Sequence, residues 1–262
     1  MKHINKQKEP QQFIDWKNKA NEDWQPSFES LRGSPTGHIV KCPLVKEQGG
    51  LCCYCESKIT ENDSHFEHFR PQTQFKDLVL DYGNLHCSCI KEPKKEIDLH
   101  CGHFKWEYFD EKLISPLESD CESHFVFSSN GKIEPSFHDN ERAVYTINIL
   151  GLNNNDLPEQ RKAMIDVFNG AGRELLSEED ISKITVDDQI KFANDYLQPN
   201  ENGMFNEFWT TIKYFSPTIM IILNKHILKT KNYGSTNFSQ GFRGDIPKHL
   251  NRRRGTFIRF IV

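Results

Sequence analysis

The stretch between residues 50 and 110 carries the side chains that could do chemistry. Six of the eight cysteines lie there, and Cys52 and Cys55 form a C-x-x-C pair. Such a pair places two thiolates on one side of a tight turn, at the separation that a tetrahedral zinc ion requires. A closed site needs two more thiolates, and the candidates are Cys87, Cys89 and Cys101. The alternative is that these cysteines are buried without a metal, as free cysteines often are.

Harder ligands lie between the cysteines. The segment "HFEHFRPQ", residues 65–72, sets Glu67 directly before His68. Carboxylate and imidazole suit a hydrated catalytic cation better than a closed thiolate site. An imidazole with an ordinary pKa of about 6.5 can take a proton from water at neutral pH. The sequence therefore separates two roles, with sulfur holding the fold and oxygen and nitrogen facing a substrate. Each histidine could instead be a buried structural ring, and for His65 we favour that interpretation.

Four motifs together, "CCYCE", "HFEHFRPQ", "DYGNLHCSC" and "CGHFKW", resemble those of HNH endonucleases, whose metal-binding module has a ββα fold. The resemblance implies that Glu67 binds the catalytic cation, which would be Mg²⁺ or another divalent ion. It implies that His68 is the general base and that Asn84 orients that base.

The same resemblance completes the cysteine set. It places Cys89 and Cys101 with Cys52 and Cys55 around a structural zinc ion. Cys53 and Cys87 would then be small apolar residues.

The second ligand of the catalytic cation is where this chain departs from the family pattern. The family usually places that ligand directly after the last cysteine, and Gly102 stands there. His103, one residue later, is our choice, and His100 is the other candidate. Arg70 and Lys105 could contact phosphate, although a salt bridge for Arg70 and a helical position for Lys105 are the simpler alternatives.

More narrowly, these motifs resemble the PtuB-like HNH proteins of Septu and retron anti-phage systems. The resemblance covers roughly residues 50 to 110, and it implies nuclease activity on DNA or RNA together with a PtuA-like ATPase partner. The alternative function is a zinc module without catalysis that binds nucleic acid or a protein.

The pattern of elements that must position these residues predicts a mostly helical α+β protein. We expect an N-terminal helical segment (1–49), an HNH module (50–112) and a hairpin plus helical region with a basic C-terminal tail (113–262). Asn130-Gly131 predicts a hairpin turn between alternating apolar residues. Apolar periodicity and helix-terminating residues predict helices over 11–24, 38–48, 101–113, 139–150, 156–170, 187–197 and 204–229, with a break or kink at Pro217.

Composition limits the function classes. The chain has 262 residues, 19 Phe and 36% hydrophobic residues, which is enough for a folded core. It has no apolar run that could span a bilayer and no signal region, so we expect a cytoplasmic protein without membrane contact, in which cysteines do not form disulfides. The net charge is −4, but eight Lys or Arg and one acidic residue follow from Lys229 onward. Overall acidity argues against strong unaided DNA binding, so a partner should supply much of the grip.

Overall fold

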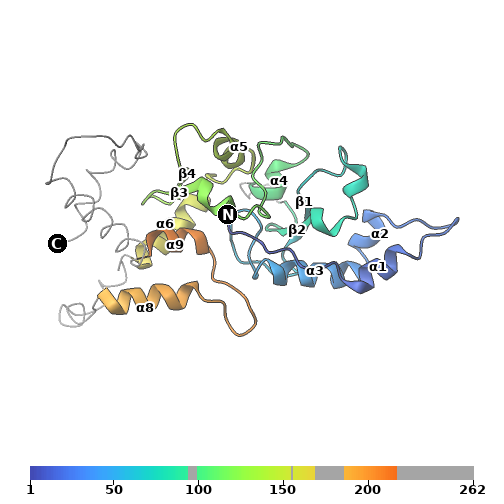
Figure 1. The fold of residues 1–262 in the computed structure, drawn as a ribbon, viewed down its shortest axis with the longest axis horizontal. Coiled ribbons are helices and arrows are strands. Elements are labelled where there is room, and N and C mark those ends of the chain that lie inside the picture. Colours follow the sequence, from blue (N-terminus) through green and yellow to red (C-terminus); the bar gives the residue numbers. More distant parts are fainter. Residues whose placement is uncertain (94–98, 155, 169–185, 217–262) are drawn as a thin grey trace, which may run out of the picture.

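The computed structural model describes residues 1–93, 99–154, 156–168 and 186–216 (Figure 1). The basic tail, Pro217 and the later part of the helix expected over 204–229 lie outside the described residues. Within them the protein combines helices with two small antiparallel sheets, which confirms the α+β class. The division into three segments stays a prediction.

The N-terminal segment forms α1 (Gln11–Lys17), α2 (Phe28–Arg32) and α3 (Pro35–Glu47). The single helix expected over 11–24 was wrong in its length. The carboxamide oxygen of Asn21 accepts hydrogen bonds from the backbone of Asp23 and Trp24, which offers this stretch an alternative to helix. α3 begins earlier than expected because Ser34 caps it through the backbone N–H of Gly37.

The central segment is a hairpin followed by a short helix. β1 (His65–His68) pairs with β2 (Leu85–Ser88) in antiparallel register, with Glu67 opposite His86. α4 (Cys101–Lys105) follows, and it is much shorter than the helix expected over 101–113. It ends because Trp106 adopts a left-handed backbone with φ of 51°. Short 3-10 turns at Lys76–Leu78 and Tyr82–Asn84 shape the loop between the two strands.

The remainder holds a second hairpin and four helices within its described part. β3 (Phe125–Phe127) and β4 (Ile133–Pro135) pair about the Asn130-Gly131 turn, as predicted, after a 3-10 turn at Cys121–His124. Gly131 has φ of +82°, and a side chain there would collide with the carbonyl of Pro158. The helices are α5 (Glu141–Ile149), α6 (Asp156–Phe168), α8 (Val186–Leu197) and α9 (Trp209–Phe215).

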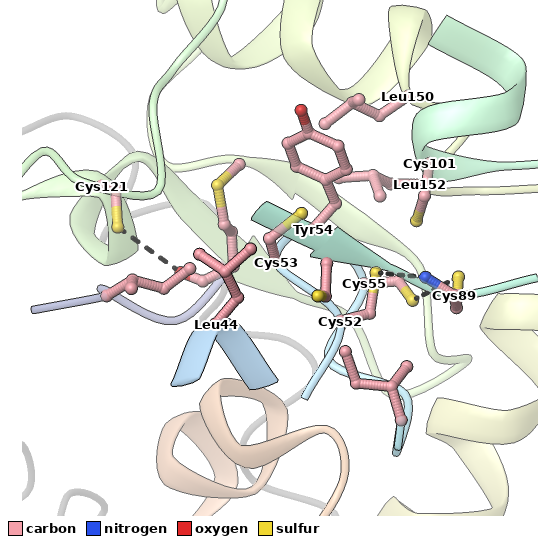
Figure 2. Packing of buried hydrophobic residues seen from close by; sticks show 14 of the residues in the cluster. Leu44, Cys52, Cys53, Tyr54, Cys55, Cys89, Cys101, Cys121, Leu150 and Leu152 are labelled. Atoms are coloured by element: carbon pink, nitrogen blue, oxygen red, sulfur yellow. Dashed lines mark hydrogen bonds between the residues drawn. The ribbon is translucent and has the colours of Figure 1, made fainter. Parts of the chain in front are cut away.

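One buried cluster joins these parts. It includes Leu44 of α3, Leu85 of β2 and Phe208 beside α9, and seven of the eight cysteines belong to it (Figure 2). A buried polar contact reinforces it, because the carboxylate of Glu56 pairs with the Met1 ammonium at 2.8 Å and accepts the Thr210 N–H at 2.7 Å. Within the described part of the chain, every helix is too short or too polar to cross a bilayer.

Candidate metal centre and active site

Four buried cysteines converge at the junction of the hairpin and α4. The sulfur atoms of Cys52, Cys55, Cys89 and Cys101 all lie within 4.8 Å of one another. Sγ of Cys55 and Sγ of Cys89 are 3.7 Å apart, and tetrahedral zinc with bonds of about 2.3 Å would place its sulfurs about 3.8 Å apart. Figure 2 shows Cys52, Cys55 and Cys89 close together, whereas Cys121 lies well apart. This donor set fits a structural metal ion.

Backbone donors favour thiolates in this group. The N–H of Cys89 points to Sγ of Cys52 at 3.4 Å, and the N–H of Ser57 points to Sγ of Cys55 at 3.5 Å. Burial opposes ionisation, but sulfhydryl hydrogen bonds from Cys101 and Cys89 bring the pKa of Cys55 down to about 6. Because a metal-bound cysteine is a thiolate, the lowered pKa of Cys55 favours metal binding by that sulfur.

His100 belongs to the cysteine group. Its Nδ1 lies 3.1 Å from Sγ of Cys101 and 3.6 Å from Sγ of Cys89. The sequence offered His100 as one of two candidates for the second ligand of a catalytic cation. The structure places it against the sulfurs instead.

Glu67 is a buried carboxylate anchored through one oxygen. The hydroxyl of Tyr54 donates to its Oε1 at 2.9 Å, and Nζ of Lys105 lies 3.0 Å from the same oxygen. Burial would raise the pKa of Glu67, but the adjacent Lys105 ammonium holds it at about 2. The carboxylate is therefore ionised at neutral pH.

Lys105 has a buried ammonium, with only 1% of its surface exposed. Besides Glu67 it donates to the backbone carbonyls of His68 at 3.0 Å and Phe69 at 3.3 Å. A phosphate contact, which the sequence suggested for this lysine, does not agree with this burial. Its position instead fixes the Glu67 carboxylate to the end of β1.

The side chain of His68 points to the face of the hairpin opposite that of Glu67. Glu67 contacts α4 through Lys105, whereas the ring of His68 packs 4.5 Å from the ring of Phe28 in α2. The expected cation ligand and the expected general base therefore contact different parts of the protein. Nε2 of His68 is 3.0 Å from the carbonyl of Val79, which places the proton on Nε2 and a lone pair on Nδ1. Burial lowers the pKa of His68, so its ring is neutral at neutral pH.

Asn84 braces the chain that follows His68. Its Oδ1 accepts the N–H of Arg70 at 2.8 Å, and its Nδ2 donates to the carbonyls of Arg70 at 3.0 Å and Leu78 at 3.1 Å. The Arg70 side chain lies at the surface, where it pairs with Glu111 at 3.5 Å. Asn84 and Arg70 both line an open pocket of about 370 Å³.

Comparison with known proteins shows which proteins this chain resembles in sequence. No family model matches the chain. A Vibrio cholerae protein that carries the name of a retron Vc95 HNH endonuclease is 33% identical over 135 residues, which span 49% of this chain and 64% of that protein. The Septu protein PtuB of Bacillus thuringiensis is 28% identical over 91 residues, 34% of each chain. An Escherichia coli protein named for the HNH endonuclease of retron Ec83 is 25% identical and covers 66% of this chain and 83% of its own length.

This chain is a homologue of retron HNH proteins and of PtuB. Its matches span less than two thirds of the first two relatives. These matches therefore show similarity over part of the relatives' length, and the activity of this chain depends on its own residues.

His103, which was expected to bind the cation together with Glu67, directs a ring nitrogen to a backbone carbonyl instead. Nε2 of His103 lies 2.7 Å from the carbonyl of Ile90, and its ring lies 4.1 Å from that of His65. Among the described residues, the groups of three or more metal-ligating side chains do not include Glu67. The histidine nearest Glu67 is His65, whose Nε2 is 3.7 Å from Oε2 of the carboxylate. Side chains two residues apart on a strand share a face, so residues 65 and 67 of β1 lie on one side of the hairpin. This spacing was the signal that could have placed His65 beside Glu67.

His86 is a second residue that the sequence left unassigned. It lies opposite Glu67 on β2, is 1% exposed, and has no hydrogen-bond partner at either ring nitrogen. Burial lowers the pKa of His86 to about 3, so the ring is neutral. It is an uncharged ring on the strand position opposite Glu67, 6.5 Å from the ring of Phe69.

Proposed function

We propose that this chain is a metal-dependent HNH endonuclease that hydrolyses phosphodiester bonds of nucleic acid. Its homology to proteins named as HNH endonucleases supports the proposal. So does the order of its central segment, in which two antiparallel strands are followed by a helix that bears a cysteine and faces a carboxylate. That order is the one expected of a ββα-metal module.

The four cysteines are proposed to hold a structural zinc ion. Four thiolates make a closed coordination shell with no position for a substrate. The ion would join the turn at Cys52 and Cys55 to β2 through Cys89 and to α4 through Cys101. It would thereby stabilise a segment whose two strands are each four residues long.

Glu67 is proposed to bind a catalytic divalent cation such as Mg²⁺, which when bound would act as a Lewis acid toward a phosphate oxygen. His68 is proposed as the general base that accepts a proton from water at Nδ1. It is the last residue of β1, so its ring lies at the end of the hairpin even though it leaves the opposite face. Asn84 is a positioning residue, because it fixes the backbone directly after His68. Arg70 is proposed to contact phosphate.

One observation carries the proposal: an ionised carboxylate is anchored through a single oxygen beside a four-thiol group. Burying a charge is costly, and proteins that retain one at such a position commonly use it in a site. Its second oxygen faces His65 of β1 and Gly102 at the start of α4.

The test is cleavage of DNA and of tRNA by the zinc-loaded protein, with Mg²⁺ or Mn²⁺ and with EDTA. We expect cleavage that requires the added cation and that His68→Ala abolishes while zinc content and circular dichroism stay unchanged. His38→Ala, which alters an exposed histidine of α3, is the matched control. If His68→Ala cuts as well as the parent, the assignment of the base is wrong.

A non-catalytic zinc module is the second candidate function. Two observations favour it: Lys105 already neutralises Glu67, and His68 faces away from that carboxylate. It predicts that the parent retains zinc and binds nucleic acid or a protein, but cuts neither substrate with any cation.

We further propose that the protein acts in anti-phage defence with a PtuA-like ATPase. The names of its relatives, which refer to retrons and to Septu, support this proposal, and so does the net charge of −4. Because an acidic chain is repelled by phosphates, a partner would supply affinity for the nucleic acid. Co-purification with such an ATPase is the expected result. A monodisperse single subunit with full activity would contradict it.

A further inference from the structure

The start of α4 lacks a side chain where it faces Glu67. A Cβ added to Gly102 would lie 2.6 Å from Nε2 of His65 and would overlap Oε2 of Glu67. The position directly after the last cysteine is therefore closed to any side chain in this conformation. The space that such a side chain would take is filled from the strand, by the ring of His65.

The two atoms that border this space are Oε2 of Glu67 and Nε2 of His65. Oε1 of Glu67 is occupied by Tyr54 and Lys105, which leaves Oε2 to face the ring. Nε2 of His65 lies 3.7 Å from Oε2, beyond hydrogen-bond range. Two ligand atoms that are each about 2.1 Å from one ion lie at most about 4.2 Å apart, so a single cation can span this gap.

The tautomer of His65 completes the geometry. Nδ1 of His65 lies 3.0 Å from the carbonyl of Ile90, and a carbonyl only accepts. In its neutral form the ring therefore carries its proton on Nδ1 and presents a lone pair at Nε2 to the carboxylate. A histidine whose second nitrogen donates to a backbone carbonyl is the usual arrangement of a metal ligand. The His103 ring, 4.1 Å away, contacts the same carbonyl and holds the His65 ring in place.

We propose that His65 and Glu67 are the protein ligands of the divalent cation, and that His65 replaces the helix residue expected at position 102. This inference rests on the proposed nuclease function. Two protein ligands on adjacent positions of one strand face leave the other coordination positions to water and to phosphate oxygens, as Mg²⁺ and Mn²⁺ prefer.

The experiment measures Mn²⁺ binding to the zinc-loaded full chain by electron paramagnetic resonance of free Mn²⁺, without substrate. We expect His65→Ala to weaken Mn²⁺ affinity about tenfold or more, as Glu67→Gln also does. His103→Gln, which alters the neighbouring ring, should change it less than about threefold if His103 only supports His65. Zinc content and circular dichroism report whether each variant is folded.

The outcomes separate the two proposals. If the parent binds Mn²⁺ through Glu67 and His65→Ala binds it equally well, the inference about His65 is overturned and the nuclease function stands. The same holds if the parent cleaves nucleic acid but binds no Mn²⁺, because His65 and Glu67 would then form a simple ion pair. A parent that neither binds Mn²⁺ nor cleaves contradicts both proposals.

Discussion

Two sites with opposite electrostatics share the first turn of α4. Cys101 completes the four-thiol group, and the next residue, Gly102, faces Glu67 and His65. The only buried guanidinium that interacts with the thiols in the described chain is that of Arg161, which cannot balance four thiolates, whereas the single Glu67 carboxylate is already paired with Lys105. The cysteine group thus depends on its metal for charge balance, and the Glu67 site is balanced without one.

The difference suggests a division of labour. A site that needs its ion to compensate charge will keep the ion throughout the life of the fold. A carboxylate that is compensated at one oxygen can gain and lose a cation at the other without loss of the fold. Stability should therefore respond to cysteine substitution, and cation binding to substitution at the Glu67 site.

The largest effect is expected from Cys55→Ser. Loss of one thiolate should release the bound zinc and reduce the free energy of unfolding by more than about 5 kcal/mol. Metal analysis and chemical denaturation measure both quantities. Cys53→Ala is the matched control, because Cys53 is equally buried but lies outside the four-thiol group, and it should keep zinc at a cost of about 1 kcal/mol. Equal losses in the two variants would show that the cysteines only pack.

Lys105→Met should have the next largest effect. It removes a buried ammonium and leaves the Glu67 carboxylate without its counter-charge, which costs about 3–5 kcal/mol. Zinc content should not change. The double variant Glu67→Gln/Lys105→Met should lose less than the sum of the two single variants, since each removes the partner of the other. Additive losses in chemical denaturation would mean that the pair is not coupled.

The sequence predicted best what depends on local spacing. The C-x-x-C turn and the Asn130-Gly131 hairpin involve neighbouring residues, and each lies where its pattern indicated. Helix lengths were less predictable, because α4 ends where Trp106 takes a left-handed backbone that no periodicity reveals.

The Glu67 site shows why the rest could not be read from the chain. The partners of Glu67 come from a turn, a strand and a helix that only the fold brings together: Tyr54, His65 and Lys105. The family pattern directed attention to the residues after Cys101, and a glycine there removes the expected ligand. Which side chain fills the space is a question of packing.

Asn84→Ala should have an intermediate effect at the edge of the same site. It removes three hydrogen bonds to the backbone of Arg70 and Leu78, worth about 1 kcal/mol each at most, so we expect a loss of about 2 kcal/mol. Asn84→Asp keeps the acceptor for the Arg70 N–H but loses both donors, and it should be at least as damaging. A loss below about 0.5 kcal/mol for both variants would contradict the bracing role.

The smallest effect on stability is expected from Arg70→Gln, and it tests the proposed phosphate contact. The side chain of Arg70 is 39% exposed, and that of its ion-pair partner Glu111 is 78% exposed. An ion pair this exposed contributes little, so the free energy of unfolding should change by less than about 0.5 kcal/mol.

Binding of single-stranded DNA or RNA should nevertheless weaken, and the slope of log affinity against log salt should fall by about 1, because one phosphate contact is lost. Arg32→Gln, which alters an exposed arginine of α2, is the matched control and should leave both quantities unchanged. If Arg70→Gln and Arg32→Gln weaken binding equally, the contribution is one of net charge and not of position. Arg70 follows the segment that Asn84 braces. A position-specific loss would therefore place the nucleic-acid backbone on the Asn84 side of the hairpin, next to His68 and away from the four thiols.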